Sequence, residues 1–231
     1  MKKTLLALAV AAALVPSLAM AEAGDIVVRL RATHIAPDES SKLGAQTDAT
    51  YGAGNAATLY GSAGATLGVD ANTIPEIDFS YYITKNIAAE LILAVGTRHD
   101  VHINGYTAAG SNQLGSVNLL PPTLTAQWHF NPDQTFDPYV GAGVSYVRAM
   151  DNSLSYNNAV PIRISRNSFG PAIQAGVDYN LPDSKWLLNF DVKKIWFNTK
   201  VELNNPTGHW QKIDQLDVDP WVVSVGFGRK F

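Results

Sequence analysis

The sequence predicts an all-β fold, an eight-stranded antiparallel transmembrane β-barrel with short periplasmic turns and long extracellular loops. Three observations lead to this prediction: an export signal at the start, connections that alternate between short and long, and a last strand, residues 218–231, with two different faces. One parity of that strand is mostly large and apolar, as at Trp221 and Phe227, and the other is mostly small or polar. A period of two residues is typical of a strand. A barrel in the outer membrane turns the apolar face of such a strand to lipid.

Residues 1–21 have the features of a secretory signal peptide. Two lysines give a positively charged start, an apolar stretch covers residues 5–18, and Ala19-Met20-Ala21 fits a small-x-small cleavage site. The stretch is shorter than the roughly 20 apolar residues that span a bilayer, which argues against a membrane anchor. We therefore expect cleavage after residue 21 and one outer-membrane barrel domain over residues 22–231.

The mature chain is acidic and free of cysteine. Without the signal peptide it carries 15 basic and 20 acidic residues, a net charge of −5. This is not the basic footprint of a nucleic-acid-binding protein, so we expect no nucleic-acid partner. The absence of cysteine excludes disulfides and thiol chemistry. An exported, strand-rich chain of this kind favours the outer membrane of a Gram-negative cell.

Eight segments alternate between apolar and polar residues and are the predicted barrel strands. In order they are residues 25–36, 74–84, 87–98, 117–130, 137–148, 169–181, 186–199 and 218–231. Three connections are short and contain turn formers, at residues 84–86, 131–136 and 182–185. The other four are long and are expected to be extracellular loops, at residues 37–73, 99–116, 151–168 and 202–216. Such alternation is typical of outer-membrane barrels.

The outward parity of these strands is apolar, with aromatic residues at both ends. We expect one aromatic girdle beside the periplasmic turns and one at the outer interface, made by Trp128, Phe130, Tyr179 and Trp186 and by Tyr146, Trp196 and Trp221. Lys194 breaks the outward pattern. We expect its long side chain to reach the outer headgroups.

The inward parity near the periplasmic end is charged. An eight-stranded barrel is only wide enough for its side chains to fill, and buried charges are costly unless they are paired. We therefore expect a salt-bridged polar plug rather than a pore. Its predicted members are Arg29, Arg31, Glu90, Asp178, Asp191 and Lys193.

Nearer the outer end the inward parity becomes apolar, which predicts a dry vestibule that opens to the outside. Its expected lining is Ile35, Leu119, Pro121, Val147, Ile195, Phe197 and Val222. Proline cannot donate to a strand ladder, so Leu120, Pro121 and Pro122 are expected to release the fourth strand from a neighbour. That would leave a lateral opening through which a solute reaches the outer leaflet. A bulge with no opening is the alternative.

Seven stretches of the sequence resemble the OmpW family of small outer-membrane proteins, which includes AlkL-type hydrocarbon uptake proteins. They are AGDIVVRLRATHIAP, EIDFSYYITKNIAAEL, NLLPPTLTAQWHF, DPYVGAGVSY, FGPAIQAGVDYNL, WLLNFDVKKIWF and DPWVVSVGFGRKF. The resemblance implies an eight-stranded barrel and passive uptake of small hydrophobic molecules through a channel that opens laterally. By position it matches Leu119, Pro121 and Pro122 to the wall opening, and Arg29, Glu90, Asp191 and Lys193 to the polar interior.

Two clusters in the predicted loops have simpler interpretations than metal binding. His99 and His102 flank Asp100 and Val101, but a zinc site would need a third protein ligand, so a solvated loop is the simpler interpretation. Asp214, Asp217 and Asp219 crowd the outer rim. They could hold divalent cations that bridge lipopolysaccharide, and repelling surface charges are the simpler interpretation. We expect neither a metal site nor a cofactor.

The predicted function is a passive outer-membrane channel for small hydrophobic molecules. The alternative is a structural or surface-receptor barrel that acts through its extracellular loops without transport. A soluble lipocalin-like barrel would need the apolar parity inside. Ser224, His129 and Asp178 are all inward, but no motif marks them as a catalytic set, so we expect no enzyme. Expected partners are outer-membrane lipid and lipopolysaccharide, hydrophobic solutes and the barrel assembly machinery, and the expected state is a monomer.

Overall fold

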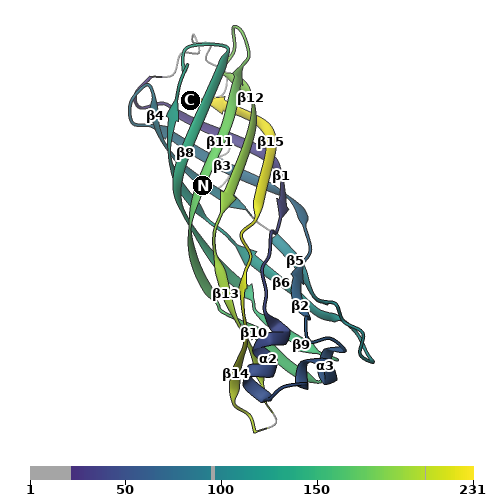
Figure 1. Ribbon diagram of the computed structural model, residues 1–231. Helices are drawn as coiled ribbons and strands as arrows, with labels where there is room; N and C mark the ends of the chain where they lie inside the picture. Colours follow the sequence, from purple (N-terminus) through teal and green to yellow (C-terminus); the bar gives the residue numbers. More distant parts are fainter. Residues whose placement is uncertain (1–21, 95–96, 206) are drawn as a thin grey trace, which may run out of the picture.

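The computed structural model describes residues 22–94, 97–205 and 207–231, so the predicted signal peptide lies outside the described residues. Eight strands close into a barrel (Figure 1). They are β1 (Ile26–Ala36), β3 (Asn72–Tyr82), β4 (Ile87–Ala94), β7 (Thr123–His129), β8 (Phe136–Asp151), β11 (Asn167–Asn180), β12 (Trp186–Ile195) and β15 (Trp221–Lys230). Each strand pairs antiparallel with the next, and β15 pairs back to β1. The predicted eight-stranded antiparallel barrel is confirmed.

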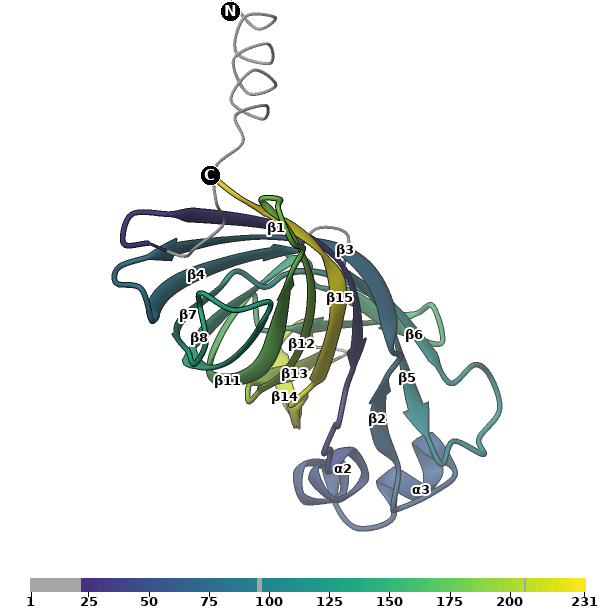
Figure 2. The ribbon, with the colours of Figure 1, turned by 90° about the horizontal axis from the view of Figure 1, so that it is seen from above.

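Closure is visible in the register of the first strand. Ile26 lies opposite Tyr81 of β3, and Val27 lies opposite Lys230 of β15. Figure 2, turned by 90°, shows the strands as a ring. Because both edges of β1 are paired, the barrel has no free sheet edge there, which is the condition for a sheet to sit in lipid.

The exterior and interior of the barrel follow the two parities of each strand. Phe79, Leu124 and Val225 face outward and are each more than a third exposed, whereas their neighbours Asp78 and Thr125 are buried. The four aromatic residues expected beside the short turns are also exposed, at Trp128, Phe130, Tyr179 and Trp186. The outward surface is therefore apolar over the barrel wall, as a lipid environment requires.

The four long connections expected to be extracellular loops are largely folded, which the sequence did not predict. They hold, wholly or in part, β2 (Thr66–Val69), β5 (Thr97–Asn104), β6 (Gln113–Leu120), β9 (Ser153–Tyr156), β10 (Val160–Ile164), β13 (Asn198–Asn204), β14 (Trp210–Asp217) and the helices α2 (Leu43–Tyr51) and α3 (Asn55–Tyr60). Together they form a folded extension at the barrel end away from the short turns (Figure 1). Of the helices in the described residues, none could cross a bilayer.

The extension folds because its strands alternate too. Inward residues such as Leu114, Leu154, Ile162, Val201 and Ile213 are at most 5% exposed and form one apolar core. Burial of such side chains contributes about 1.5–3 kcal/mol each relative to full exposure. The loop interpretation missed this because the alternating runs are short and lie between Gly- and Asn-rich turns.

The fourth predicted strand is divided in two. β6 ends at Leu120 and β7 begins at Thr123, so Pro121 and Pro122 lie between them. The two prolines lack the N–H group that a ladder needs. They therefore mark the boundary between the barrel strand β7 and the extension strand β6.

Candidate functional site

Charged side chains from several strands meet inside the barrel on the side of the short turns. Arg29 of β1 donates through Nη1 to Asp78 Oδ1 at 2.9 Å and through Nη2 to Asp178 Oδ2 at 2.5 Å. Arg31 donates through Nε to Glu76 Oε1 at 2.6 Å. All five side chains are buried, and Arg29 has no exposed surface. The ion pairs tie β1 to β3 and β11 across the lumen.

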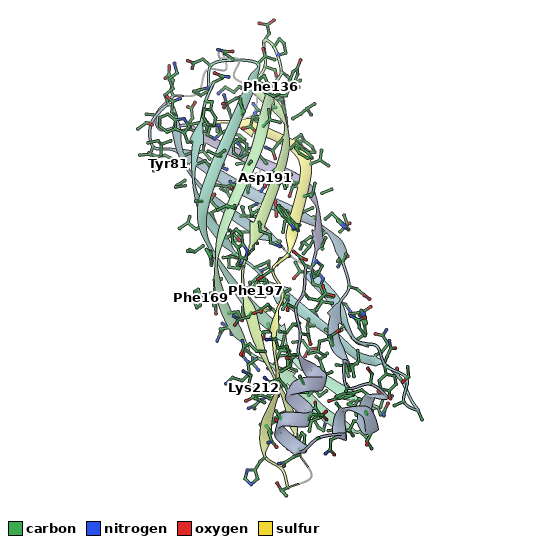
Figure 3. All side chains as sticks on the ribbon, in the orientation of Figure 1. Tyr81, Phe136, Phe169, Asp191, Phe197 and Lys212 are labelled. Carbon is green, nitrogen blue, oxygen red and sulfur yellow. The ribbon has the colours of Figure 1, made fainter. Side chains whose placement is uncertain are left out.

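The same network continues to β4 and β12. Glu90 Oε1 lies 3.5 Å from Arg31 Nη1. Lys193 Nζ lies 3.1 Å from Asp191 Oδ1, and Tyr139 donates its hydroxyl to the other oxygen of Asp191 at 2.9 Å. We call this group the polar plug and define it as Arg29, Arg31, Glu76, Asp78, Glu90, Asp178, Asp191 and Lys193. The structure brings together all six residues named from the sequence, and Asp191 is labelled in Figure 3.

Glu76 and Asp78 are the two members that sequence reasoning missed. Both lie on β3, where they alternate with the outward residues Ile77 and Phe79, and both are buried. The alternation of β3 was a sufficient signal to place them inside the barrel. Glu76 provides the nearest carboxylate partner of Arg31, and Asp78 is the second carboxylate partner of Arg29, after Asp178.

His129 lies at the turn-side end of the plug in a satisfied setting. Its Nδ1 is 2.7 Å from Asp137 Oδ2, and Tyr82 and Tyr139 stack against its ring with centroids 5.0 Å away. His129, Asp137 and Asp178 present ligand atoms within 4.8 Å of one another. Asp178, however, already accepts two hydrogen bonds from Arg29.

The three inward residues that could have formed a catalytic set are not joined to one another. Ser224 Oγ accepts from Thr33 Oγ1 at 2.9 Å, whereas His129 contacts Asp137. Among the described residues, no hydrogen bond joins Ser224 to His129, so the pairing of nucleophile and base that hydrolysis needs is missing.

Directly beyond the plug lies an apolar cavity of about 660 Å³, open solvent at its mouth included. We call it the plug-side cavity, because Glu76 and Lys193 of the plug form part of its lining. All seven residues expected to line a vestibule contribute to its wall, namely Ile35, Leu119, Pro121, Val147, Ile195, Phe197 and Val222.

A second apolar space, the outer cavity, continues into the extension and measures about 570 Å³ by the same measure. The two cavities share five lining residues: Val69, Leu119, Val147, Phe197 and Val218. In Figure 3, Phe197 lies nearer to the folded extension than Asp191 does. The shared residues place the two cavities next to each other between the extension and the plug, and we call them together the apolar passage.

Sequence reasoning missed the lining that comes from the expected loops. Val69 belongs to β2, and His99 and Val218 also line the plug-side cavity. Val69 and His99 lie in segments that were expected to be loops, so their parity was not considered. Val218 begins the last predicted strand and has the same parity as Val222, so the alternation already placed it on the inward face.

The hydrogen-bond ladder is interrupted beside the prolines. The last pair between β4 and β7 joins Ile92 to Thr123, and the pair at the barrel end of the β5–β6 ladder joins Thr97 to Leu119. On the other side the ladder continues, because Tyr146 N donates to Pro122 O at 2.9 Å. Residues 95–96, which connect β4 to β5, lie outside the described residues.

Two interpretations of charged outer residues are wrong. Asp214 is not a surface charge: it is fully buried, accepts a short hydrogen bond from Ser41 Oγ and also accepts from Lys42 N at 3.1 Å. Lys194 does not extend freely to headgroups. It is 8% exposed and lies 2.9 Å from Asp38 Oδ2, with its ammonium over the ring of Trp221.

The histidine pair is not part of a solvated loop either. His99 and His102 belong to β5, and His99 is 4% exposed. His99 Nδ1 lies 2.8 Å from the carbonyl oxygen of Asp70, and His102 Nδ1 lies 3.4 Å from the Asp70 carboxylate. The strand separates the two rings, so they do not converge as metal ligands would.

The sequence profile of the OmpW family matches residues 22–231. The chain belongs to the OmpW family. Outer membrane protein W of Escherichia coli K12 is 35% identical over 235 residues, which cover 100% of this chain and 99% of that protein. Outer membrane protein AlkL of Ectopseudomonas oleovorans is 29% identical over 168 residues, 72% of this chain and 70% of that protein. Membership of the OmpW family confirms the predicted outer-membrane location.

Solved structures agree with the fold. The outer membrane protein OprG of Pseudomonas aeruginosa has a TM-score of 0.76 and 30% identity, over 93% of this chain and 99% of that one. AlkL in lipid bilayers has a TM-score of 0.68 at 24% identity, over 93% of each chain, and shows the fold alone. Like these OmpW-type barrels, this chain sits in the lipid of the outer membrane, in a class of proteins that are generally not enzymes.

Proposed function

We propose that this OmpW-family protein is a passive channel that takes up small hydrophobic molecules from outside the cell through an apolar vestibule and releases them sideways into the membrane. The observation that carries the proposal is the junction between an apolar passage and a charged, fully buried plug. Apolar solutes gain about 0.8 kcal/mol for each methylene group that leaves water. The same solutes gain nothing from the plug, whose groups are already paired with one another.

The lateral exit is the second part of the proposal. Because the plug blocks the way down the barrel, a solute in the plug-side cavity must leave through the wall. Pro121 lines that cavity and lies between the last described pair of the β4–β7 ladder and the first described pair of the β5–β6 ladder. We infer that the solute leaves there, between β4–β5 and β6–β7, into the acyl chains of the membrane.

A charge inside the passage should slow uptake. Phe197 lines both cavities and is 9% exposed. In Phe197→Asp an apolar solute must pass a carboxylate that holds water, so we expect uptake of an alkane or arene into vesicles to fall at least about ten-fold, the effect of about 1.4 kcal/mol. Asn198→Asp is the matched control, since it adds the same charge one residue away on the exposed side.

Folding must be checked in the same preparations, by heat-dependent gel mobility and circular dichroism. If Phe197→Asp does not fold, Phe197→Trp narrows the passage without a charge and should also reduce uptake. A folded Phe197→Asp variant with normal uptake would refute the channel. It would favour the alternative, a surface barrel that acts through its folded extension.

A further inference from the structure

We propose that His99 makes the channel prefer hydrophobic molecules that carry a hydrogen-bond donor, such as long-chain alcohols, over plain hydrocarbons. This inference rests on the function proposed above, because His99 lines the plug-side cavity. It adds a substrate class and a residue that selects it.

The other polar side chains in the cavity wall are already engaged. Thr97 Oγ1 donates to the carbonyl oxygen of Leu119, and Thr123 Oγ1 contacts the carbonyl oxygen of Pro121 and Ser145 Oγ at 3.2 and 2.9 Å. The two charged residues of the lining lie at the plug end of the cavity, where Glu76 accepts from Arg31 and Lys193 donates to Asp191. His99 is the remaining neutral polar side chain of the lining.

His99 differs from them. Its Nδ1 lies 2.8 Å from the carbonyl oxygen of Asp70, and a carbonyl oxygen can only accept, so Nδ1 carries the hydrogen. In the neutral ring Nε2 is then an acceptor. Within the part of the chain that the structure describes, Nε2 has no hydrogen-bond partner. His99 lines the plug-side cavity, so we place this acceptor at the cavity wall.

The ring is held in this orientation by the link between β2 and β3. Asp70 N donates to Asp100 O at 2.9 Å, and the Asn72 side chain donates to Arg98 O at 2.7 Å. These bonds fasten the link to β5 on both sides of His99. The Asp70 carbonyl therefore stays in contact with Nδ1, which fixes the orientation of the ring and leaves Nε2 as the acceptor.

A bound alcohol can donate its hydroxyl hydrogen to Nε2, while its chain lies against the apolar wall. A hydrocarbon leaves Nε2 unpaired, and an ether brings an acceptor but no donor. A neutral hydrogen bond of this kind is worth about a two- to ten-fold preference. We expect the order of uptake, relative to membrane partitioning, to be alcohol above ether and hydrocarbon.

The test compares 1-decanol, methyl nonyl ether and decane in vesicles that contain the purified protein. His99→Leu should lower the uptake of decanol relative to decane about two- to ten-fold, and His99→Gln, which keeps an acceptor oxygen, should restore part of it. His102→Leu is the matched control: the same replacement on the same strand at a residue outside the lining of either cavity. An unchanged decanol-to-decane ratio in folded His99→Leu overturns the inference.

A binding measurement separates this inference from the proposed function. In ¹⁵N-histidine-labelled protein in lipid nanodiscs, 1-decanol should shift the Nε2 resonance of His99, and decane should not. If the resonance shifts but no solute is taken up, the proposed channel fails and the alcohol site stands. If decane is taken up normally but decanol leaves the resonance unmoved, the channel stands and the role of His99 is refuted.

Discussion

Removal of Arg29 should destabilise the barrel more than removal of any exposed arginine. Arg29 is fully buried and pairs with Asp78 and Asp178 on two different strands. In Arg29→Gln both carboxylates lose their main cationic partner while they remain shielded from water. Breaking a buried ion pair on one side costs about 3–5 kcal/mol, because the partner charge is left uncompensated.

The matched control is Arg163→Gln in the extension. Arg163 Nη2 lies 2.7 Å from Glu202 Oε2, as close as the pairs in the plug, but its side chain is 40% exposed. Water replaces such a partner, so the expected cost is about 0–1 kcal/mol. The same replacement in the same protein thus isolates the effect of burial from that of pairing.

The measurement is the free energy of unfolding, from urea titrations in lipid or detergent followed by tryptophan fluorescence. Asp178→Asn and the double variant Arg29→Gln/Asp178→Asn complete a cycle, in which the double variant should cost less than the sum of the two single ones. If Arg29→Gln costs no more than Arg163→Gln, then the plug residues are hydrated in solution and our account of a sealed lumen is wrong.

Three further predictions concern the extension and the wall. Ser41→Ala removes a donor from the buried carboxylate of Asp214, so amide exchange in α2 should become faster, as a loss of about 1–3 kcal/mol predicts. Gly143→Ala places a Cβ against the carbonyl oxygen of Leu124, so the yield of folded barrel on gels should fall. Burial raises the pKa of Tyr60 above its ordinary value near 10. That contribution to stability is present at lower pH and lost as the pH rises through the raised pKa, so alkaline solution should loosen the extension in proteolysis.

The barrel strands could be predicted because lipid and lumen impose opposite requirements on alternate residues. Ile77 and Phe79 face outward and Asp78 faces inward, so a period of two is visible in the sequence itself. Neighbours in the sheet follow from short connections, as between β3 and β4. The pairing of β15 with β1 follows only from the requirement that the sheet has no open edge.

The folded extension could not be predicted in the same way. α2 has no apolar stripe at helical spacing, since Leu43, Gly44 and Thr47 are its only buried residues. It is held by contacts from distant segments, such as the hydrogen bond from Ser41 to Asp214. Propensity and periodicity carry no signal for contacts of this kind, so Asp214 looked like a surface charge.

Part of the candidate site could be predicted from the sequence and part could not, for the same physical reason. The plug residues on β1, β4, β11 and β12 could be named because each strand fixes its own parity. Which cation pairs with which carboxylate depends on the relative register of the strands. Arg29 and Asp178, for example, are paired although they are 149 residues apart in the sequence. His99 was not predicted to line the cavity because its segment was expected to be a loop. In the structure that segment is β5, which follows β4 in the chain.

Pro121 and Pro122 connect the fold to the proposed transport. A closed barrel cannot release a solute sideways unless the ladder is broken on one side, and an ordinary residue there would leave an unpaired N–H group in lipid, at a cost of several kcal/mol. Proline has no N–H group, so it breaks the ladder without that cost. Pro122 O still accepts from Tyr146 N, so β8 holds the chain in place. The two prolines thus satisfy both requirements at the depth where the apolar cavity meets the plug.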